Sequence, residues 1–100
     1  MAAYFVFHNR VLDEAKIQEY IPLAIESMAP YGAEILVVDE SSQVIEGSTS
    51  LPRTVVLKFA SREAAMEWYN SPAYQAALPL RLEATEGVGV LVDGFVFPGQ

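Results

Sequence analysis

The chain has 100 residues, 52% of them hydrophobic, and its thirteen acidic and six basic side chains give a formal net charge of −7. This length fits a single domain over residues 1–100, and so negative a chain excludes nucleic acid and anionic membranes as expected partners. The sequence has no cysteine and one histidine, His8, which excludes disulfides, thiolate metal ligands and a multi-histidine metal site within one chain.

The first part of the chain predicts a strand, a helix and a second strand. Residues 3–10 are rich in aromatic and β-branched side chains, which is typical of a strand. A helix is expected to begin after Asp13 as N-cap and to end at Gly32, because its apolar side chains recur on one helical face. Pro22 lies within that face and predicts a kink. Glu34–Asp39 is expected to form the second strand.

The middle and the end of the chain predict two further main strands and a short arm. Residues 39–42 predict a turn, and residues 43–47 are expected to form a short strand that continues as a hairpin arm. Residues 53–60 and 87–96 are expected to be the third main strand and the last strand, because alternate apolar side chains share one face in each: Val55, Leu57 and Phe59, and Val88, Val90 and Val92.

Residues 61–81 predict two helices in close succession. Ser61 can cap the first helix, whereas Ser71 and Pro72 end that helix and open the second as its N-cap and first residue. Arg81 follows near the end of the second helix. Aromatic side chains crowd the corner between the two helices: Trp68, Tyr69 and Tyr74.

This order predicts an α+β fold of the ferredoxin-like β-α-β-β-α-β type, a four-stranded antiparallel sheet with its helices on one face. The other face has no cover in a monomer, yet two of the strands carry opposed apolar side chains: Tyr4 and Val6 against Phe5 and Phe7, and Leu36 and Val38 against Ile35 and Val37. We therefore expect a homodimer formed through the sheet. Lys58 and Asp93 are polar exceptions, expected to pair with each other or with acids of the partner chain.

Several segments together resemble a known family. They are Glu46-Gly47, Arg53-Thr54-Val55-Val56-Leu57-Lys58-Phe59, Ser61-x-Glu-x-Ala65-x-x-Trp68-Tyr69-x-Ser71-Pro72-x-Tyr74-Gln75, and Arg81 with a closing glycine-bracketed strand. Nearly the whole chain resembles the family called domain of unknown function 1330, in the dimeric α+β barrel superfamily. The resemblance implies a small ferredoxin-like domain whose sheet pairs face to face in a homodimer, and it implies no established activity. Ala33 departs from the family pattern, which often has a second glycine there.

His8, Glu46 and Arg53 are weak candidates for catalysis. Histidine can exchange a proton near neutral pH, so His8 could act as a general base, although a lone strand histidine is more often packed or hydrogen-bonded. Glu46 and Arg53 flank one loop and could orient a polar small molecule at a pocket mouth. The alternative is a structural ion pair between them that pins the loop.

Trp68, Tyr69, Tyr74 and Arg81 are candidates for substrate binding. The three aromatic side chains could line a pocket for an apolar or aromatic ligand, and their helical spacing equally suits a core. Arg81 could hold a ligand carboxylate, cap its helix or form a salt bridge. A ligand site is expected between the helices and the sheet, with six side chains nearby: His8, Glu46, Arg53, Trp68, Tyr74 and Arg81.

Two functions stay open at this point. One is a small homodimeric α+β barrel that binds or transforms a small apolar or aromatic molecule between sheet and helices; superfamily relatives include cofactor-independent monooxygenases and isomerases, an analogy of fold alone. The other is a non-catalytic structural or regulatory dimer. No cofactor and no metal are expected, because the sequence has no phosphate loop and no metal-ligand spacing. No apolar run approaches the roughly 18 residues that span a bilayer, so a cytoplasmic protein is expected.

Overall fold

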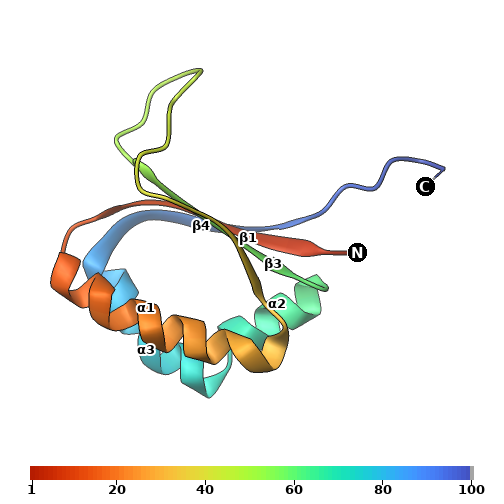
Figure 1. The fold of residues 1–100 in the computed structure, drawn as a ribbon, viewed down its shortest axis with the longest axis horizontal. Coiled ribbons are helices and arrows are strands. Elements are labelled where there is room, and N and C mark those ends of the chain that lie inside the picture. The colour runs from red at the N-terminus through yellow and green to blue at the C-terminus, as the bar shows by residue number, and fades with distance from the viewer. Residues whose placement is uncertain (100) are drawn as a thin grey trace.

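The computed structural model describes residues 1–99 and packs their helices on one side of an arched sheet (Figure 1). The elements in chain order are β1 (Ala3–Val11), α1 (Glu14–Met28), a 3-10 turn (Ala29–Tyr31), β2 (Glu34–Asp39), β3 (Arg53–Phe59), α2 (Arg62–Tyr69), α3 (Pro72–Ala84) and β4 (Thr85–Asp93). The strands are antiparallel in the order β2-β3-β1-β4. This arrangement confirms the predicted ferredoxin-like α+β fold.

Polar side chains start the α-helices where the sequence predicts. Asp13, Ser61 and Ser71 each accept a hydrogen bond from a backbone N–H three residues further along the chain. Gly32 ends the first helical run at φ 66°, a left-handed conformation that glycine adopts without a Cβ clash. Pro22 lies inside α1, which continues through it as one helix. Among the described residues, no helix is both long and apolar enough to cross a membrane.

One predicted strand is absent, and another has different bounds. Residues 43–47 form no strand and lie in the loop 40–52, which projects from the sheet away from the helices (Figure 1). In that loop Pro52 faces Ser42, whose backbone N–H donates to the Pro52 carbonyl. Pro52 has no N–H of its own, so it cannot donate a hydrogen bond to continue a strand ladder. The last strand runs over Thr85–Asp93 rather than 87–96, because β4 pairs with β1 along its whole length and β1 begins at Ala3, opposite Asp93.

A β-bulge changes the faces of β2. Ile35 pairs with Leu57, and then Val37 rather than Leu36 pairs with the next residue of β3. A bulge inserts one residue and so shifts the alternation of side chains beyond it. Ile35 and Val38 therefore face the helices, whereas Val37 faces the other side. The predicted grouping of Ile35 with Val37 is wrong for this reason.

The sheet face turned away from the helices, here called the open face, carries an apolar row across all four strands. Val37, Val56, Val6 and Val90 are successive register partners in the order of the strands. Val37 and Val90 are 39% and 47% exposed. The prediction that apolar side chains reach both faces of the sheet is confirmed.

Lys58 and Asp93 do not pair with each other. Lys58 is the register partner of Tyr4 on the open face, whereas Asp93 is the partner of Ala3 on the helix side. The two side chains therefore point to opposite sides of the sheet. Lys58 Nζ lies 3.8 Å from Glu34 Oε2, and Arg62 Nε donates to Asp93 Oδ1 at 2.8 Å.

Trp68 and Tyr74 belong to the core between the sheet and the helices. Neither has exposed surface, and their ring centroids lie 4.1 Å apart. The Trp68 ring also lies 5.3 Å from that of Phe59, and its Nε1 donates to Ser27 Oγ at 2.9 Å. The aromatic corner was expected either to line a pocket or to form part of the core, and Trp68 and Tyr74 are packed in the core.

Candidate functional site

A cavity of about 100 Å³ lies between α1 and the helix side of β1, β2 and β3. We call it the α1 cavity. Ile25 of α1 and Ile35 of β2 are 50% and 46% exposed, so the cavity opens to solvent between these two elements. Most of its wall is apolar: Phe7, Ile21, Ala24, Ile25, Met28, Ile35, Val38, Val55 and Leu57.

Four polar side chains complete the lining of the α1 cavity: Asn9, Tyr20, Arg53 and Arg81. Two of them are cations, and no carboxylate from the described residues lines the cavity. A cavity with apolar walls and a few convergent polar groups is the usual form of a small-molecule site.

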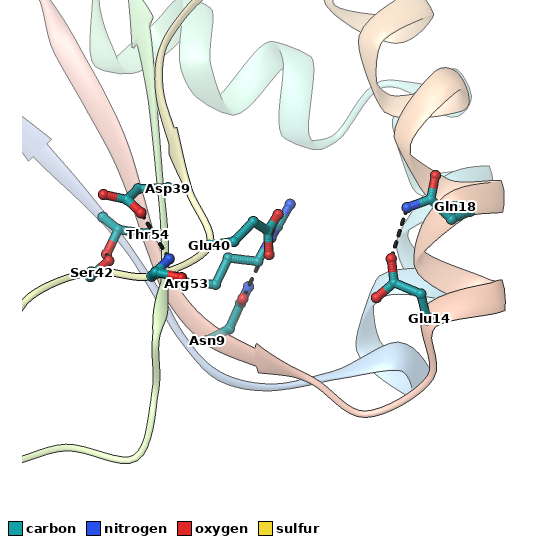
Figure 2. A network of polar contacts seen from close by, with 9 residues as sticks. Asn9, Glu14, Gln18, Asp39, Glu40, Ser42, Arg53 and Thr54 are labelled. Atoms are coloured by element: carbon teal, nitrogen blue, oxygen red, sulfur yellow. Dashed lines mark hydrogen bonds and ion pairs between the residues drawn. The ribbon is translucent and has the colours of Figure 1, made fainter.

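Strand register builds one polar end of the cavity. Asn9 of β1 and Arg53 of β3 are direct register partners on the helix side of the sheet, and both are buried. Arg53 Nη1 donates to Asn9 Oδ1 at 3.4 Å, and Arg53 Nε donates to Glu40 Oε1 at 3.1 Å (Figure 2). Glu40 follows the end of β2 and is largely exposed, so it neutralises Arg53 from the solvent side.

Arg81 and two tyrosines build the other polar end. Arg81 Nε donates to Tyr74 Oη at 3.2 Å, and Tyr74 Oη lies 2.7 Å from Tyr20 Oη within hydrogen-bond distance. The Arg81 guanidinium also lies over the Phe7 ring, 4.9 Å from its centroid, which favours the cation through the ring's negative face. Contacts from α3 and β1 thus hold the guanidinium, and α1 supports them through the bond between Tyr20 and Tyr74.

Both titratable ends of this network keep their protons at physiological pH. Burial, with smaller effects of Tyr74, raises the pKa of Tyr20 well above its ordinary value. Burial lowers the pKa of Arg81, but the neighbouring hydroxyls of Tyr74, Tyr20 and Tyr69 together outweigh burial and raise that pKa. The site therefore presents a neutral phenol and a permanent cation.

A second cavity of about 370 Å³ lies on the far side of Phe7 and Arg81, which line both cavities. Tyr69 and Gly89 also line it. A Cβ added to Gly89 would lie 2.8 Å from two carbon atoms of the Phe7 ring, so only glycine lets that ring lie flat against β4. The side chains of Phe7 and Arg81 therefore lie between the α1 cavity and the second cavity.

The structure brings together some of the candidate residues and separates others. Arg53 and Arg81 line the α1 cavity, Tyr69 lines the second cavity, and Tyr74 reaches Arg81 through its hydroxyl. Three candidates lie elsewhere. Trp68 is enclosed in the core, Glu46 is exposed in the loop 40–52, and His8 lies on the open face.

Two expected interactions take a different form. Arg53 pairs with Glu40 and not with Glu46, because β2 ends beside the start of β3 and carries Glu40 to that point. His8 Nδ1 lies 3.4 Å from Thr54 Oγ1 across the open face, with the sheet between its ring and the α1 cavity.

Sequence reasoning missed Asn9, Tyr20 and Glu40. A usable signal existed for the first two: Asn9 is a polar side chain two residues beyond Phe7 on the buried face of its strand, and Tyr20 lies on the apolar stripe of its helix. Glu40 gives no such signal, because its approach to Arg53 depends on the register of two strands.

The model of a family described as "Domain of unknown function (DUF1330)" matches residues 2–95. Three solved structures are similar in fold. A protein of unknown function from Rhodopseudomonas palustris has a TM-score of 0.81 and 12% identity, with 95% of this chain and 83% of that chain covered. A dimeric ferredoxin-like protein of unknown function from Jannaschia sp. CCS1 has a TM-score of 0.69 and 16% identity, with 96% and 100% covered.

The third, SnoaB from Streptomyces nogalater, is a cofactor-independent oxygenase. Its TM-score is 0.67 at 9% identity, with 99% of this chain and 98% of that chain covered. At these identities the similarity shows the fold alone. No curated protein matches the chain.

Proposed function

We propose a function for this chain, which belongs to the family described as "Domain of unknown function (DUF1330)". It is a cytoplasmic homodimer that binds or transforms a small apolar or aromatic molecule between sheet and helices. The α1 cavity is the observation that carries this proposal. Its wall is apolar, it opens between α1 and β2, and two buried or half-buried arginines converge on it.

The open face supports the homodimer. A row of four valines crosses the sheet there, and no helix of the described chain covers it (Figure 1). Burying such a row against a second copy stabilises the assembly by about 25 cal/mol for each Å² of apolar surface removed from water, before the cost of association. A two-fold pairing of identical faces closes the assembly.

The fold leaves room for turnover as well as binding. SnoaB has a similar fold and is a cofactor-independent oxygenase. The enzymatic form of the proposal is therefore a reaction in the α1 cavity without a cofactor, with Arg81 and Tyr20 as the groups that contact the substrate.

A second function, a non-catalytic dimer module, is favoured by two observations. The aromatic corner is filled rather than hollow: Trp68 and Tyr74 have no exposed surface. Within the described residues, every fully buried side-chain nitrogen and oxygen has a hydrogen-bond partner. A protein with this second function would bind no small molecule in the α1 cavity.

Methyl NMR with a neutral apolar probe separates the two functions. Benzyl alcohol added at millimolar concentration should shift the methyl resonances of Ile21 and Ile35 and leave that of Ile45, in the loop 40–52, unchanged. Ala24→Leu should abolish the shifts by filling the cavity, whereas Ala15→Leu on the exposed side of α1 should preserve them. If a panel of neutral and charged apolar probes shifts none of the lining methyls, the binding function is wrong.

A further inference from the structure

The charge inside the α1 cavity is opposite to the charge of the molecule. The chain as a whole has a formal net charge of −7. Yet the ionisable side chains that line the cavity are two arginines and the neutral phenol of Tyr20, and none is a carboxylate. None of the acidic residues among the described ones lines this apolar space, although Glu40 bonds Arg53 at its edge, and two of the six basic residues line it.

Only one of these two arginines has a charged partner. Arg53 pairs with Glu40 and also donates to Asn9. Arg81 forms no ion pair with any of residues 1–99, and its one hydrogen bond to a side chain is from Nε to the neutral Tyr74 hydroxyl. A charge removed from water without a counter-charge is costly, so Arg81 is poised to gain from an anion that enters the cavity.

The terminal amino groups of Arg81 are free to make that contact. Within the described residues neither amino group forms a hydrogen bond and no fully buried polar atom lacks a partner, so solvent reaches these groups through the two cavities that Arg81 lines. Tyr74 and Phe7 contact the guanidinium directly, and Tyr20 holds the Tyr74 hydroxyl. A planar guanidinium with two free amino groups suits the two oxygens of a carboxylate.

We propose that the ligand of the α1 cavity is a small organic carboxylate, with its carboxylate against the guanidinium of Arg81 and its apolar body against Ile21, Ala24 and Val55. This inference rests on the proposed function, since it names the chemical class of molecule that the same cavity binds. The ligand should be largely apolar because most side chains that line the cavity are apolar. It should carry one carboxylate because Arg81 is the one lining cation without a charged partner among the described residues.

A pair of ligands that differ only in charge tests the proposal. Phenylacetate and phenylacetamide have nearly the same shape, and isothermal titration calorimetry gives the affinity of the dimer for each. The carboxylate should bind at least about tenfold more tightly, because charge-assisted hydrogen bonds to arginine are roughly twice as strong as neutral ones. The preference should weaken as salt concentration rises.

Variants of Arg81 locate the source of the preference. Arg81→Met should reduce the affinity for phenylacetate to about that for phenylacetamide, and circular dichroism should show that the variant keeps the wild-type fold. Arg81→Lys should restore part of the preference. Arg62→Met, which removes an exposed cation paired with Asp93, should have no effect on either ligand.

Each outcome is decisive. Equal or tighter binding of phenylacetamide and benzyl alcohol would overturn the carboxylate while leaving the proposed function intact. A preference for phenylacetate that survives Arg81→Met would overturn the role of Arg81. Binding of no probe, neutral or charged, would contradict both the inference and the proposed function.

Discussion

Trp68 is the residue on which most of the aromatic core converges. It has no exposed surface, and its ring lies 5.6 Å from Phe5 and 4.1 Å from Tyr74 between ring centroids. Trp68→Ala should therefore lower the free energy of unfolding by about 3–5 kcal/mol, as for other large core aromatics. Urea denaturation measures this loss, and Met66→Ala on the exposed side of the same helix is the matched control. An unchanged midpoint for Trp68→Ala would contradict this packing.

Tyr20 gives the molecule a dependence on alkaline pH. Burial and the neighbouring Tyr74 raise its pKa above the ordinary value of 10.0. The folded state keeps this proton where the unfolded chain releases it, so the free energy of unfolding should fall as pH rises above about 10. Tyr20→Phe removes the ionisation, and its stability should fall less steeply over that range. Parallel curves for wild type and variant, followed by chemical denaturation, would be inconsistent with a raised pKa. Tyr4→Phe on the open face is the control.

Arg53 shows what a sequence can and cannot predict about one residue. Its place at the start of a strand and near a ligand site follows from the pattern of the chain. Its partner does not, because Glu40 and Glu46 are both acids of the same connection. The choice depends on register: Asp39 pairs with Thr54, which brings the next residue, Glu40, beside Arg53.

At the scale of elements, β4 approaches β1 too closely for a side chain at Gly87 and at Gly89. Gly89 is the register partner of Phe7, and a Cβ there would lie 2.8 Å from the Phe7 ring. Phe7 is buried, so either its ring or the strand must shift to admit the added methyl group. Gly89→Ala should lower the free energy of unfolding by about 1–3 kcal/mol through this overpacking.

A double variant checks the cause of that loss. In a Phe7→Leu background, the added methyl group meets a smaller side chain, so Gly89→Ala should cost less than half as much. Thermal unfolding of the four proteins in this cycle gives the coupling. Equal losses in both backgrounds would attribute the effect to the strand backbone and not to the ring.

Helices were predictable where a periodic pattern of apolar residues follows a polar residue that can act as N-cap. The three helices begin after Asp13, Ser61 and Ser71, as the capping pattern predicts. The β-bulge in β2 was not predictable, because the run Ile35 to Val38 is apolar throughout and contains no alternation that a shift could break. The absence of a strand at residues 43–47 was not predictable either, because it depends on the path of the loop 40–52.

At the scale of the whole molecule, we predict that the open face is the dimer interface. Val56→Glu places a charge at the centre of the valine row, so it should convert a dimer into a monomer in light scattering coupled to size exclusion. Leu23→Glu on the outer side of α1 is a matched control that should stay dimeric. A dimer that survives Val56→Glu would move the interface to another face.

The fold class was predictable because every element contributes to it, and so was a site between sheet and helices, whereas the exact position and lining of the α1 cavity were not. A cavity is the space that packed side chains fail to fill, and its place depends on rotamers and register that no sequence pattern specifies. Arg81 was a candidate from its position near a helix end, but its unpaired state is a property of the assembled fold.

Native mass spectrometry of gently purified protein tests the central claim most directly, because one spectrum reports both assembly and ligand. The account predicts a species near twice the 11.0 kDa of one chain that carries additional small-molecule mass, which Ala24→Leu removes without dissociating the dimer. A species of 11.0 kDa with no added mass, under conditions that preserve known dimers, would contradict the account.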